Sequence, residues 1–217
     1  MVERWNLVKR YTLLLLGLAI MAVGVGLSIK ADLGTSPISS VPYAVSCFAP
    51  VTVGQATIVM HCAFIAAQIL ILRKKYSLIQ LMQLPVAFLF GFLTDLGVWA
   101  VQGIPCGAYW QRWLVCLAGI FLVAVGVSLE VKANVVVLAG EGVVLAVCKV
   151  APVKFGSMKV AFDVTLVAIA CGLSLAFTGR VQGVREGTLA AAVLVGLTAK
   201  QLGRVWDRWN LAEGAKK

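Results

Sequence analysis

Apolar residues run along this chain in long uninterrupted stretches, separated by short polar breaks. A helix that crosses a membrane needs roughly 20 mostly apolar residues, because about 30 Å of hydrocarbon is crossed at about 1.5 Å per residue. Six stretches meet this length, and two stretches of 12 and 13 residues are too short. We expect spanning helices over residues 11–29, 53–72, 78–100, 113–131, 155–177 and 188–206, and short broken segments over residues 37–48 and 138–150.

The composition indicates that these stretches lie in lipid. Of the 217 residues, 61% are hydrophobic and 13% are charged, and the mean hydropathy is +0.96. Soluble domains carry about 25% charged and 45–50% apolar residues. Six helices with short loops use up the chain, so we predict a single membrane domain. The six cysteines show no C-x-x-C spacing, and we interpret them as small apolar side chains.

The second half of the chain repeats the first. A shift of 102 residues aligns the halves without gaps from Leu15 to about Leu72, and the alignment continues after an insertion of three residues. Apolar low complexity alone would hardly bring Gly, Lys and Pro into one register. We therefore predict two membrane repeats, residues 1–106 and 107–217. The matches include Gly17 with Gly119, Gly24 with Gly126, Lys30 with Lys132, Pro50 with Pro152, Gly54 with Gly156 and Gly91 with Gly196.

Positive charge marks the ends of the apolar stretches. The net charge of +10 could indicate nucleic acid, but Lys and Arg flank the stretches, as the positive-inside rule requires of a membrane protein. If the N-terminal segment and the turn at residues 73–75 are both cytoplasmic, residues 37–48 do not cross and each half crosses three times. This arrangement places 15 of the 19 Lys and Arg residues inside and gives the halves opposite orientations. The alternative, in which residues 37–48 cross, would place the cationic turn outside.

The two short segments are the best candidates for a transport site. Interrupted helices in corresponding positions of inverted repeats point to the substrate site of a transporter. Pro37 and Pro42 interrupt the first segment, and Gly140 and Gly142 interrupt the second. Irregular backbone at membrane depth is tolerated only where protein buries it or where it lines a water-filled cavity. The alternative is a helix lying on the membrane surface, but the first segment lacks the cationic face of such helices.

Polar side chains within the apolar stretches are costly, so each is a candidate for the site. His61 shares one helix face with Gly54, Thr57 and Gln68, and the repeat aligns it with Asp163. A twofold axis in the membrane plane would bring His61 and Asp163 together at mid-depth. Packing between helices is an equally good explanation for both residues.

Glu141 lies between two glycines of the second short segment, where ligand binding best explains a carboxylate. The chain has one histidine and no H-E-x-x-H, G-x-S-x-G or P-loop motif, so we predict no enzyme, no catalytic residue, no metal ligand and no cofactor. We expect a solute site formed by Ser36, Ser39, Ser40, Gln55, His61, Asn134, Glu141 and Asp163, with Asp32, Asp95, Glu130 and Lys159 in coupling or gating.

Two motifs and the glycine-rich, duplicated first helix carry a resemblance to a known group. The motif K-A-D-L-G-T-S-P at residues 30–37 and the motif T-V-G-Q at residues 52–55 resemble the YczE/YyaS/YitT group of bacterial integral membrane proteins. The resemblance covers nearly the whole chain and implies a bacterial plasma-membrane protein, without naming a substrate. The second half departs from the pattern, with N-V-V-V at residues 134–137 in place of D-L-G-T at residues 32–35, so we expect an asymmetric site.

The fold class predicted from these observations is an all-α polytopic membrane protein. It has six transmembrane helices in two inverted repeats of three, each with a short broken or re-entrant segment. We expect a multi-pass protein of the bacterial plasma membrane, with both termini cytoplasmic. The favoured function is transport of a small solute at the repeat interface, either proton-coupled or facilitative. The alternatives are an accessory or regulatory membrane protein, and a substrate-capture subunit of a multi-component importer. The expected partners are the lipid bilayer and a small-molecule solute; a homo-oligomer is left open, and nucleic acid is not expected.

Overall fold

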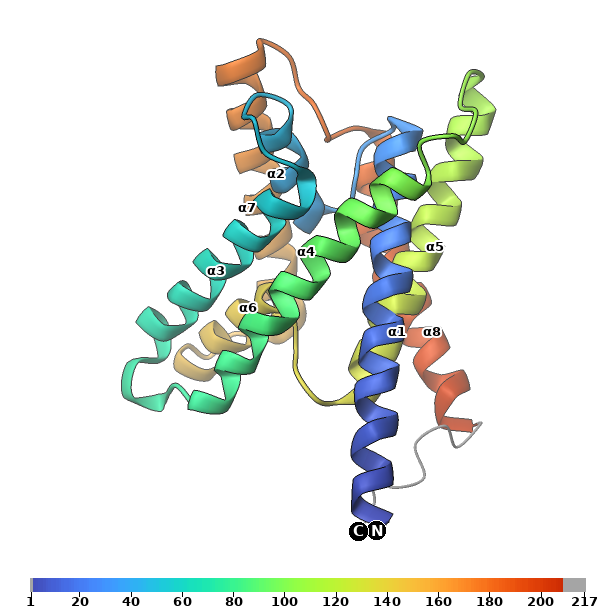
Figure 1. Cartoon of the computed structure of the whole chain (residues 1–217). Coiled ribbons are helices and arrows are strands. Elements are labelled where there is room, and N and C mark those ends of the chain that lie inside the picture. The colour runs from blue at the N-terminus through green and yellow to red at the C-terminus, as the bar shows by residue number, and fades with distance from the viewer. Residues whose placement is uncertain (1, 209–217) are drawn as a thin grey trace.

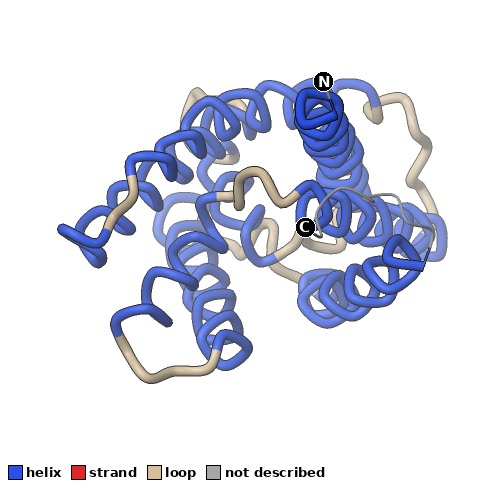
Figure 2. The backbone as a smooth tube through the Cα atoms, turned by 90° about the horizontal axis from the view of Figure 1, so that it is seen from below, coloured by secondary structure: helices blue, strands red, loops and turns tan. Residues whose placement is uncertain are grey.

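The computed structural model describes the backbone of residues 2–208 and the side chains of residues 7–206. Within this part of the chain, all regular secondary structure is helical (Figures 1 and 2). Two short 3-10 helices, Arg73–Lys75 and Leu78–Met82, join α3 to α4. The α-helices are α1 (Val2–Ala31), α2 (Pro37–Ser46), α3 (Val53–Leu72), α4 (Gln83–Ala100), α5 (Tyr109–Ala133), α6 (Ala139–Val150), α7 (Phe155–Thr178) and α8 (Glu186–Arg208).

Each expected segment corresponds to a helix, and α3 begins and ends at the expected residues. Helix α1 begins nine residues earlier than expected, and the start of the expected segment 78–100 is a 3-10 helix. Five helices are long and apolar enough to cross a membrane, counted over the described residues: Leu7–Ala31, Val53–Lys75, Leu78–Ala100, Tyr109–Ala133 and Phe155–Thr178. The sixth expected span corresponds to α8, which is 23 residues long. It is less apolar because Lys200, Gln201 and Arg204 lie in its C-terminal part. The sixth crossing therefore stays a prediction.

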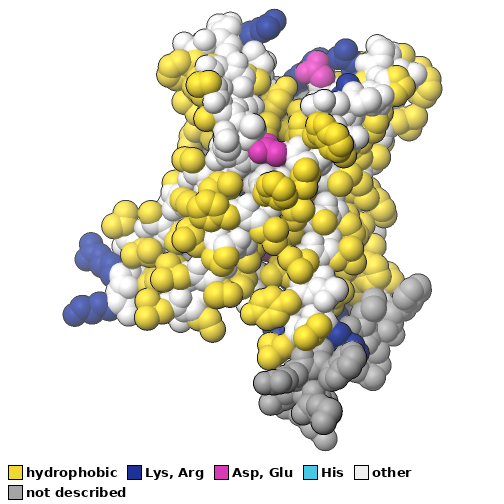
Figure 3. Space-filling model, in the orientation of Figure 1, with side chains coloured by type: hydrophobic (Ala, Val, Ile, Leu, Met, Phe, Trp, Pro, Cys, Tyr) yellow, Lys and Arg dark blue, Asp and Glu magenta, His cyan; other side chains and the backbone are white. Residues whose placement is uncertain are grey.

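The surface is that of a protein embedded in lipid. On the face shown in Figure 3, hydrophobic side chains cover the middle of the molecule, and Lys and Arg gather at its ends. Large apolar side chains such as Val59, Leu70 and Phe92 are more than half exposed, although water would disfavour them there. Five apolar helices of spanning length and this surface define a multi-pass membrane protein.

The centre of the fold is the packing of α1 against α5, which run in opposite directions (Figure 1). Their backbones touch at two glycine pairs. A Cβ atom on Gly17 would lie 2.9 Å from the carbonyl oxygen of Gly126, and one on Gly24 would lie 2.8 Å from that of Gly119. Only glycine fits at such distances. Because the repeat aligns Gly17 with Gly119 and Gly24 with Gly126, each contact is the other one with the halves exchanged.

Each short helix packs mainly against a helix of the other half. Helix α2 packs mainly against α7, and α6 packs mainly against α3, whereas α4 flanks α1 and α8 flanks α5. The chain enters the interior after α1, and α2 then returns to the end of the molecule that α1 had reached (Figure 1). The chain makes the same excursion from the opposite end between α5 and α7 (Figure 1). Each half therefore completes the packing of the other.

Candidate functional site

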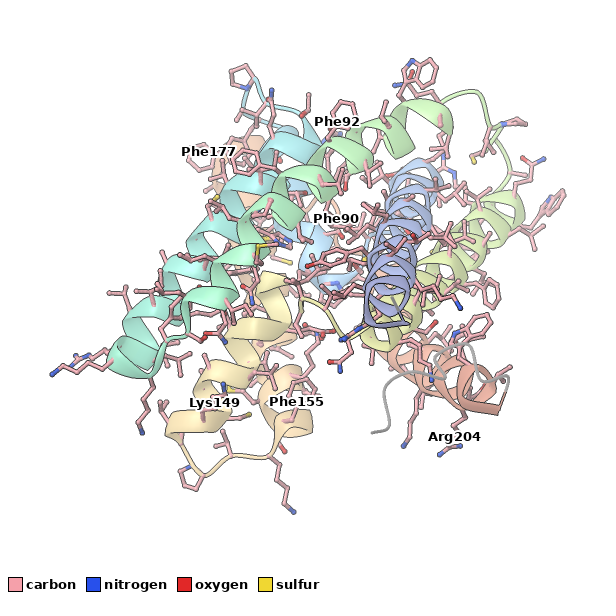
Figure 4. All side chains as sticks on the ribbon, turned by 60° about the horizontal axis from the view of Figure 1, so that its bottom comes forward. Phe90, Phe92, Lys149, Phe155, Phe177 and Arg204 are labelled. Atoms are coloured by element: carbon pink, nitrogen blue, oxygen red, sulfur yellow. The ribbon has the colours of Figure 1, made fainter. Side chains whose placement is uncertain are left out.

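A cavity of about 210 Å³ lies where the two halves meet. Each of the eight α-helices contributes to its wall. Apolar side chains form much of this wall, including Met21 and Val25 of α1, Phe90 of α4, and Val127 of α5. Phe90 is buried, whereas Phe92 on the same helix is exposed (Figure 4). The polar lining consists of Ser36, Ser39, Thr57, His61, Glu130, Glu141, Lys159 and Asp163.

Both short helices begin at this cavity. Ser36 is the N-cap residue of α2 and Leu138 that of α6, and both line the wall. The first turns touch, since a Cβ atom on Gly140 would collide with the side chain of Ile38. The hydroxyl groups of Ser36 and Ser39 lie 3.0 Å apart in a hydrogen bond. The prediction that prolines and glycines interrupt these segments is wrong, because α2 continues through Pro42 and α6 through Gly140 and Gly142 as regular helices. Their N-termini carry unpaired N–H groups and partial positive charge, so the wall is polar here.

Three carboxyl groups and one ammonium group gather beside these helix ends. Glu130 is only 4% exposed, and its Oε1 atom accepts a 2.8 Å hydrogen bond from the backbone N–H of Leu138. Lys159 donates to Asp163 one helical turn further along α7, at 2.5 Å. Glu141, in the first turn of α6, lies close enough to both for their charges to act on it. Burial raises the pKa of the Glu141 carboxyl; the Lys159 ammonium opposes this rise, and the Asp163 carboxylate adds to it.

His61 forms the α3 side of the cavity and is 1% exposed. Its Nδ1 atom has no hydrogen-bond partner among the described residues. The rings of Phe64 and Phe90 lie beside it, with centroids 6.1 Å and 6.0 Å away. A buried polar atom without a partner costs about 1–3 kcal/mol. The fold therefore carries the cost of an unpaired imidazole nitrogen beside the cavity.

The structure brings seven of the expected site residues to this cavity: Ser36, Ser39, His61, Glu130, Glu141, Lys159 and Asp163. Three others of the expected solute site do not line it. Ser40 donates to the carbonyl oxygen of Pro37 at 2.6 Å. Gln55 forms a capping box with Thr52 at the start of α3. Asn134 ends α5 in the left-handed conformation, with φ of 46°.

The remaining two, Asp32 and Asp95, hold helix ends together. Asp32 pairs with Arg112 at 3.1 Å and with Arg185 at 3.6 Å, which joins the end of α1 to α5 and to the loop before α8. Asp95 of α4 accepts a 2.7 Å hydrogen bond from the N–H of Gly54 and a 2.6 Å bond from the hydroxyl of Thr52. Neither carboxylate lines the cavity.

Asp95 belongs to a tight seam between α3 and α4. The backbones of Gly54 and Gly91 meet there, and a Cβ atom on Gly91 would lie 2.7 Å from the carbonyl oxygen of Gly54. The aligned positions of the second half are Gly156 on α7 and Gly196 on α8. A Cβ atom on either of these would meet nothing within 4 Å. The α3–α4 seam is closed and the α7–α8 seam is open.

The charged residues at the two seams also differ, in a way that favours closure of the α3–α4 seam and opening of the α7–α8 seam. The repeat aligns Thr52 with Lys154 and Asp95 with Lys200. Where the closed seam has a carboxylate against the N-terminus of α3, the open one has Lys154 as N-cap residue of α7 and Lys200 on α8. Two cations at a positive helix end repel one another, which opposes closure of this seam.

The apolar wall of the cavity and a buried pair of amide side chains, Gln68 and Gln83, were not predicted from the sequence. Gln68 is fully buried and donates to Gln83 at 2.9 Å and to the carbonyl oxygen of Ala139 at 3.1 Å, which fixes the start of α6 beside α3 and α4. Its polarity within an apolar stretch was a signal, but its partners lie 15 and 71 residues away. Only the tertiary packing pairs them.

Over the described residues, the fold is that of an all-helical, multi-pass membrane protein, and its internal cavity has both apolar and charged side chains in its wall. Comparison with known families adds one result: over residues 8–204, the chain matches a family of unknown function, DUF6198, and it belongs to that family. The match does not name the YczE/YyaS/YitT group, so that resemblance stays a prediction. No curated protein and no solved structure matches the chain.

Proposed function

We propose that this chain is an integral membrane transporter that moves a small solute by alternating access, with or without proton coupling. It crosses the membrane six times as two inverted repeats of three, with α8 as the sixth crossing and both termini in the cytoplasm. Helices α2 and α6 are re-entrant and begin at the solute site. The conformation described above is the inward-facing one.

The observation that carries this proposal is the difference between the two seams. In inverted-repeat transporters the halves exchange conformations, so a pair of helices closed in one half is open in the other. Here Gly54 and Gly91 are in backbone contact, while Gly156 and Gly196 face open space. Gly196 also lines the cavity. The open seam begins at the lower end of α7, the end that holds the α3–α4 turn and the start of α1 (Figure 1).

The outward-facing state is obtained when the two halves exchange their conformations. Helices α3 and α4 separate, which breaks the bonds from Thr52 and Gly54 to Asp95, and α7 closes on α8. Closure on that side brings Lys154 toward Lys200, so the inward-facing state is the more stable one without solute. The carboxyl groups of Glu130 and Glu141 are the candidates to carry a coupled proton, because both line the cavity.

A cross-link across the closed seam tests the exchange without knowledge of the solute. Thr52→Cys and Asp95→Cys are introduced together in a background without the six native cysteines. The side chains replaced are in hydrogen-bond contact, within reach of a short thiol cross-linker. A third cysteine at Ser39, in the cavity, reports access to a membrane-impermeant maleimide in right-side-out and inverted vesicles.

We expect Ser39→Cys to be labelled from both faces in the uncrosslinked protein and only from the cytoplasmic face after cross-linking. The single variants Thr52→Cys and Asp95→Cys, treated with the same reagent, should keep labelling from both faces. Labelling that the cross-link leaves unchanged, or labelling from one face throughout, would contradict alternating access.

A further inference from the structure

Acidic side chains outnumber basic ones in the cavity lining: Glu130, Glu141 and Asp163 lie there with Lys159. Lys159 is its one cationic side chain among the described residues and already pairs with Asp163 at 2.5 Å. Within residues 7–206, neither Glu130 nor Glu141 forms an ion pair, and the two lie close enough for their charges to interact. Buried carboxylates are costly unless a proton, a cation or several hydrogen bonds satisfy them. Among the side chains that the structure describes, Glu130 accepts one hydrogen bond, from the N–H of Leu138.

A metal ion is a poor candidate for the positive charge that would neutralise Glu130 and Glu141. Among the described residues there is no group of three or more His, Cys, Asp and Glu side chains placed to hold one. Hard cations require six or more oxygen ligands, or several retained waters, in defined geometry. An ammonium group needs less, since its N–H groups are satisfied by two or three oxygens, and carboxylates and serine hydroxyls are what the ends of α2 and α6 offer.

The remainder of the cavity suits an apolar body. Met21, Val25 and Phe90 form one wall, and Val127 and Val195 another. A volume of about 210 Å³ falls below the range of about 300–1,000 Å³ typical of pockets for drug-sized ligands. The occupant is therefore a compact molecule with one charged end.

The unpartnered Nδ1 atom of His61 is a second, independent sign of a ligand. It is buried at the α3 side of the cavity, away from any protein partner among the described residues. Like the carboxyl groups, the imidazole is a buried polar group beside the cavity that the described residues do not fully satisfy.

We propose that the cavity binds small primary ammonium compounds, with the ammonium group at Glu130 and Glu141 and the apolar body against Met21, Val25 and Phe90. The inference rests on the proposed function in taking this cavity as the solute site. It specifies the substrate class as a small organic cation.

Isothermal titration on the purified full-length protein in lipid nanodiscs tests this, with n-butylammonium as the probe. Butyrate and n-butanol are the matched anionic and neutral probes, and sodium is the inorganic cation. We expect saturable binding of butylammonium and none of the other three. Glu141→Gln should weaken it about tenfold or more, because it removes a charged hydrogen-bond partner. Glu186→Gln, the same change at an exposed position outside the cavity, should leave it unaltered.

Equal binding of butyrate or butanol would overturn the proposal, as would no binding of butylammonium or an unchanged affinity in Glu141→Gln. Tighter binding of sodium would replace the organic cation with an inorganic one. If Glu141→Gln fails to fold, two other variants replace it: Glu141→Asp, which keeps the charge, and Ser39→Ala. Glu141→Asp must then retain the binding of butylammonium. The Ser39→Cys labelling separates the two proposals. If the labelling shows alternating access but butylammonium does not bind, only the substrate class is overturned. If butylammonium binds but the labelling shows no alternating access, only the transport function is overturned.

Discussion

The Oδ1 atom of Asp95 accepts a 2.7 Å hydrogen bond from the backbone N–H of Gly54, and this bond holds the end of α4 against the start of α3. A carboxylate at a helix N-terminus satisfies unpaired N–H groups and is favoured by the helix dipole. The hydroxyl of Thr52 donates to the other oxygen of the same carboxylate. One side chain therefore closes a seam between two helices that the chain itself joins only at their opposite ends.

Replacement of Asp95 by Asn should loosen this seam. The amide has the same shape but loses the charge, and hydrogen bonds to charged groups contribute about 1.5–3 kcal/mol. We expect the free energy of unfolding to fall by about 1–2 kcal/mol and the labelling of Ser39→Cys from outside to increase. Chemical denaturation and vesicle labelling measure the two effects. Unchanged outside labelling would mean that Asp95 serves only the stability of α3.

Gly24 and Gly172 provide a matched pair for the packing of α1 on α5. A methyl group on Gly24 would lie 2.7 Å from the backbone nitrogen of Val123, whereas one on Gly172 would meet nothing within 4 Å. Gly24→Ala should therefore lower the free energy of unfolding by about 2 kcal/mol or more, as overpacking does. Gly172→Ala, also in a long apolar helix, should raise it by up to about 1 kcal/mol. A thermal unfolding series reports both, and similar effects of the two changes would contradict the close contact.

The orientation is tested by two exposed loop positions. Lys74 lies in the cationic turn after α3, and Gly107 lies between α4 and α5. In intact cells carrying single-cysteine variants, a membrane-impermeant maleimide should label Gly107→Cys and not Lys74→Cys, because the positive-inside rule places the turn in the cytoplasm. Permeabilised cells, in which both should react, are the control. Equal labelling in intact cells would be incompatible with the proposed topology.

Ammonium binding should weaken as the pH falls. Burial raises the pKa of Glu141, so this carboxyl takes up its proton at a pH above the usual glutamate range and then loses its attraction for a cation. The other titratable groups that line the cavity with it are Glu130 on α5, His61 on α3, and Lys159 and Asp163 on α7. We expect the affinity for butylammonium to decrease through this pH range, and the decrease to be smaller in Glu141→Gln. Titration calorimetry at stepped pH measures it; an affinity independent of pH would exclude Glu141 as the binding group.

Much of the helical framework could be predicted from the chain, because the length of an apolar stretch and the residues at its ends are local properties. The expected segment at residues 53–72 is α3 to the residue, and the short segments at 37–48 and 138–150 are α2 and α6. The T-x-x-Q pattern at Thr52 is also local: it is a capping box, and it explains why Gln55 lies at a helix start rather than in the cavity.

The gathering of polar residues in one cavity was predictable in part. The repeat placed His61 opposite Asp163, and both line the cavity. Asn134, from a position aligned with Asp32, was expected there as well, but it ends a helix in a left-handed conformation that suits asparagine. Polarity in an apolar stretch identifies a residue that needs a partner, and the sequence does not say which partner it finds.

The sequence by itself determined the helices, their duplication and the residues that are expensive to bury in lipid. Only the tertiary structure decided which of the two related seams is closed. The repeat supplies the same glycines to both, at Gly54 and Gly91 and at Gly156 and Gly196, and on these alone the seams are equivalent. Asp95 contacts the N-terminus of α3 in the closed seam, and the aligned residue in the other half is Lys200, whose positive charge a helix N-terminus repels. The chain shows this difference in charge, but only the packing shows that Asp95 meets a helix N-terminus.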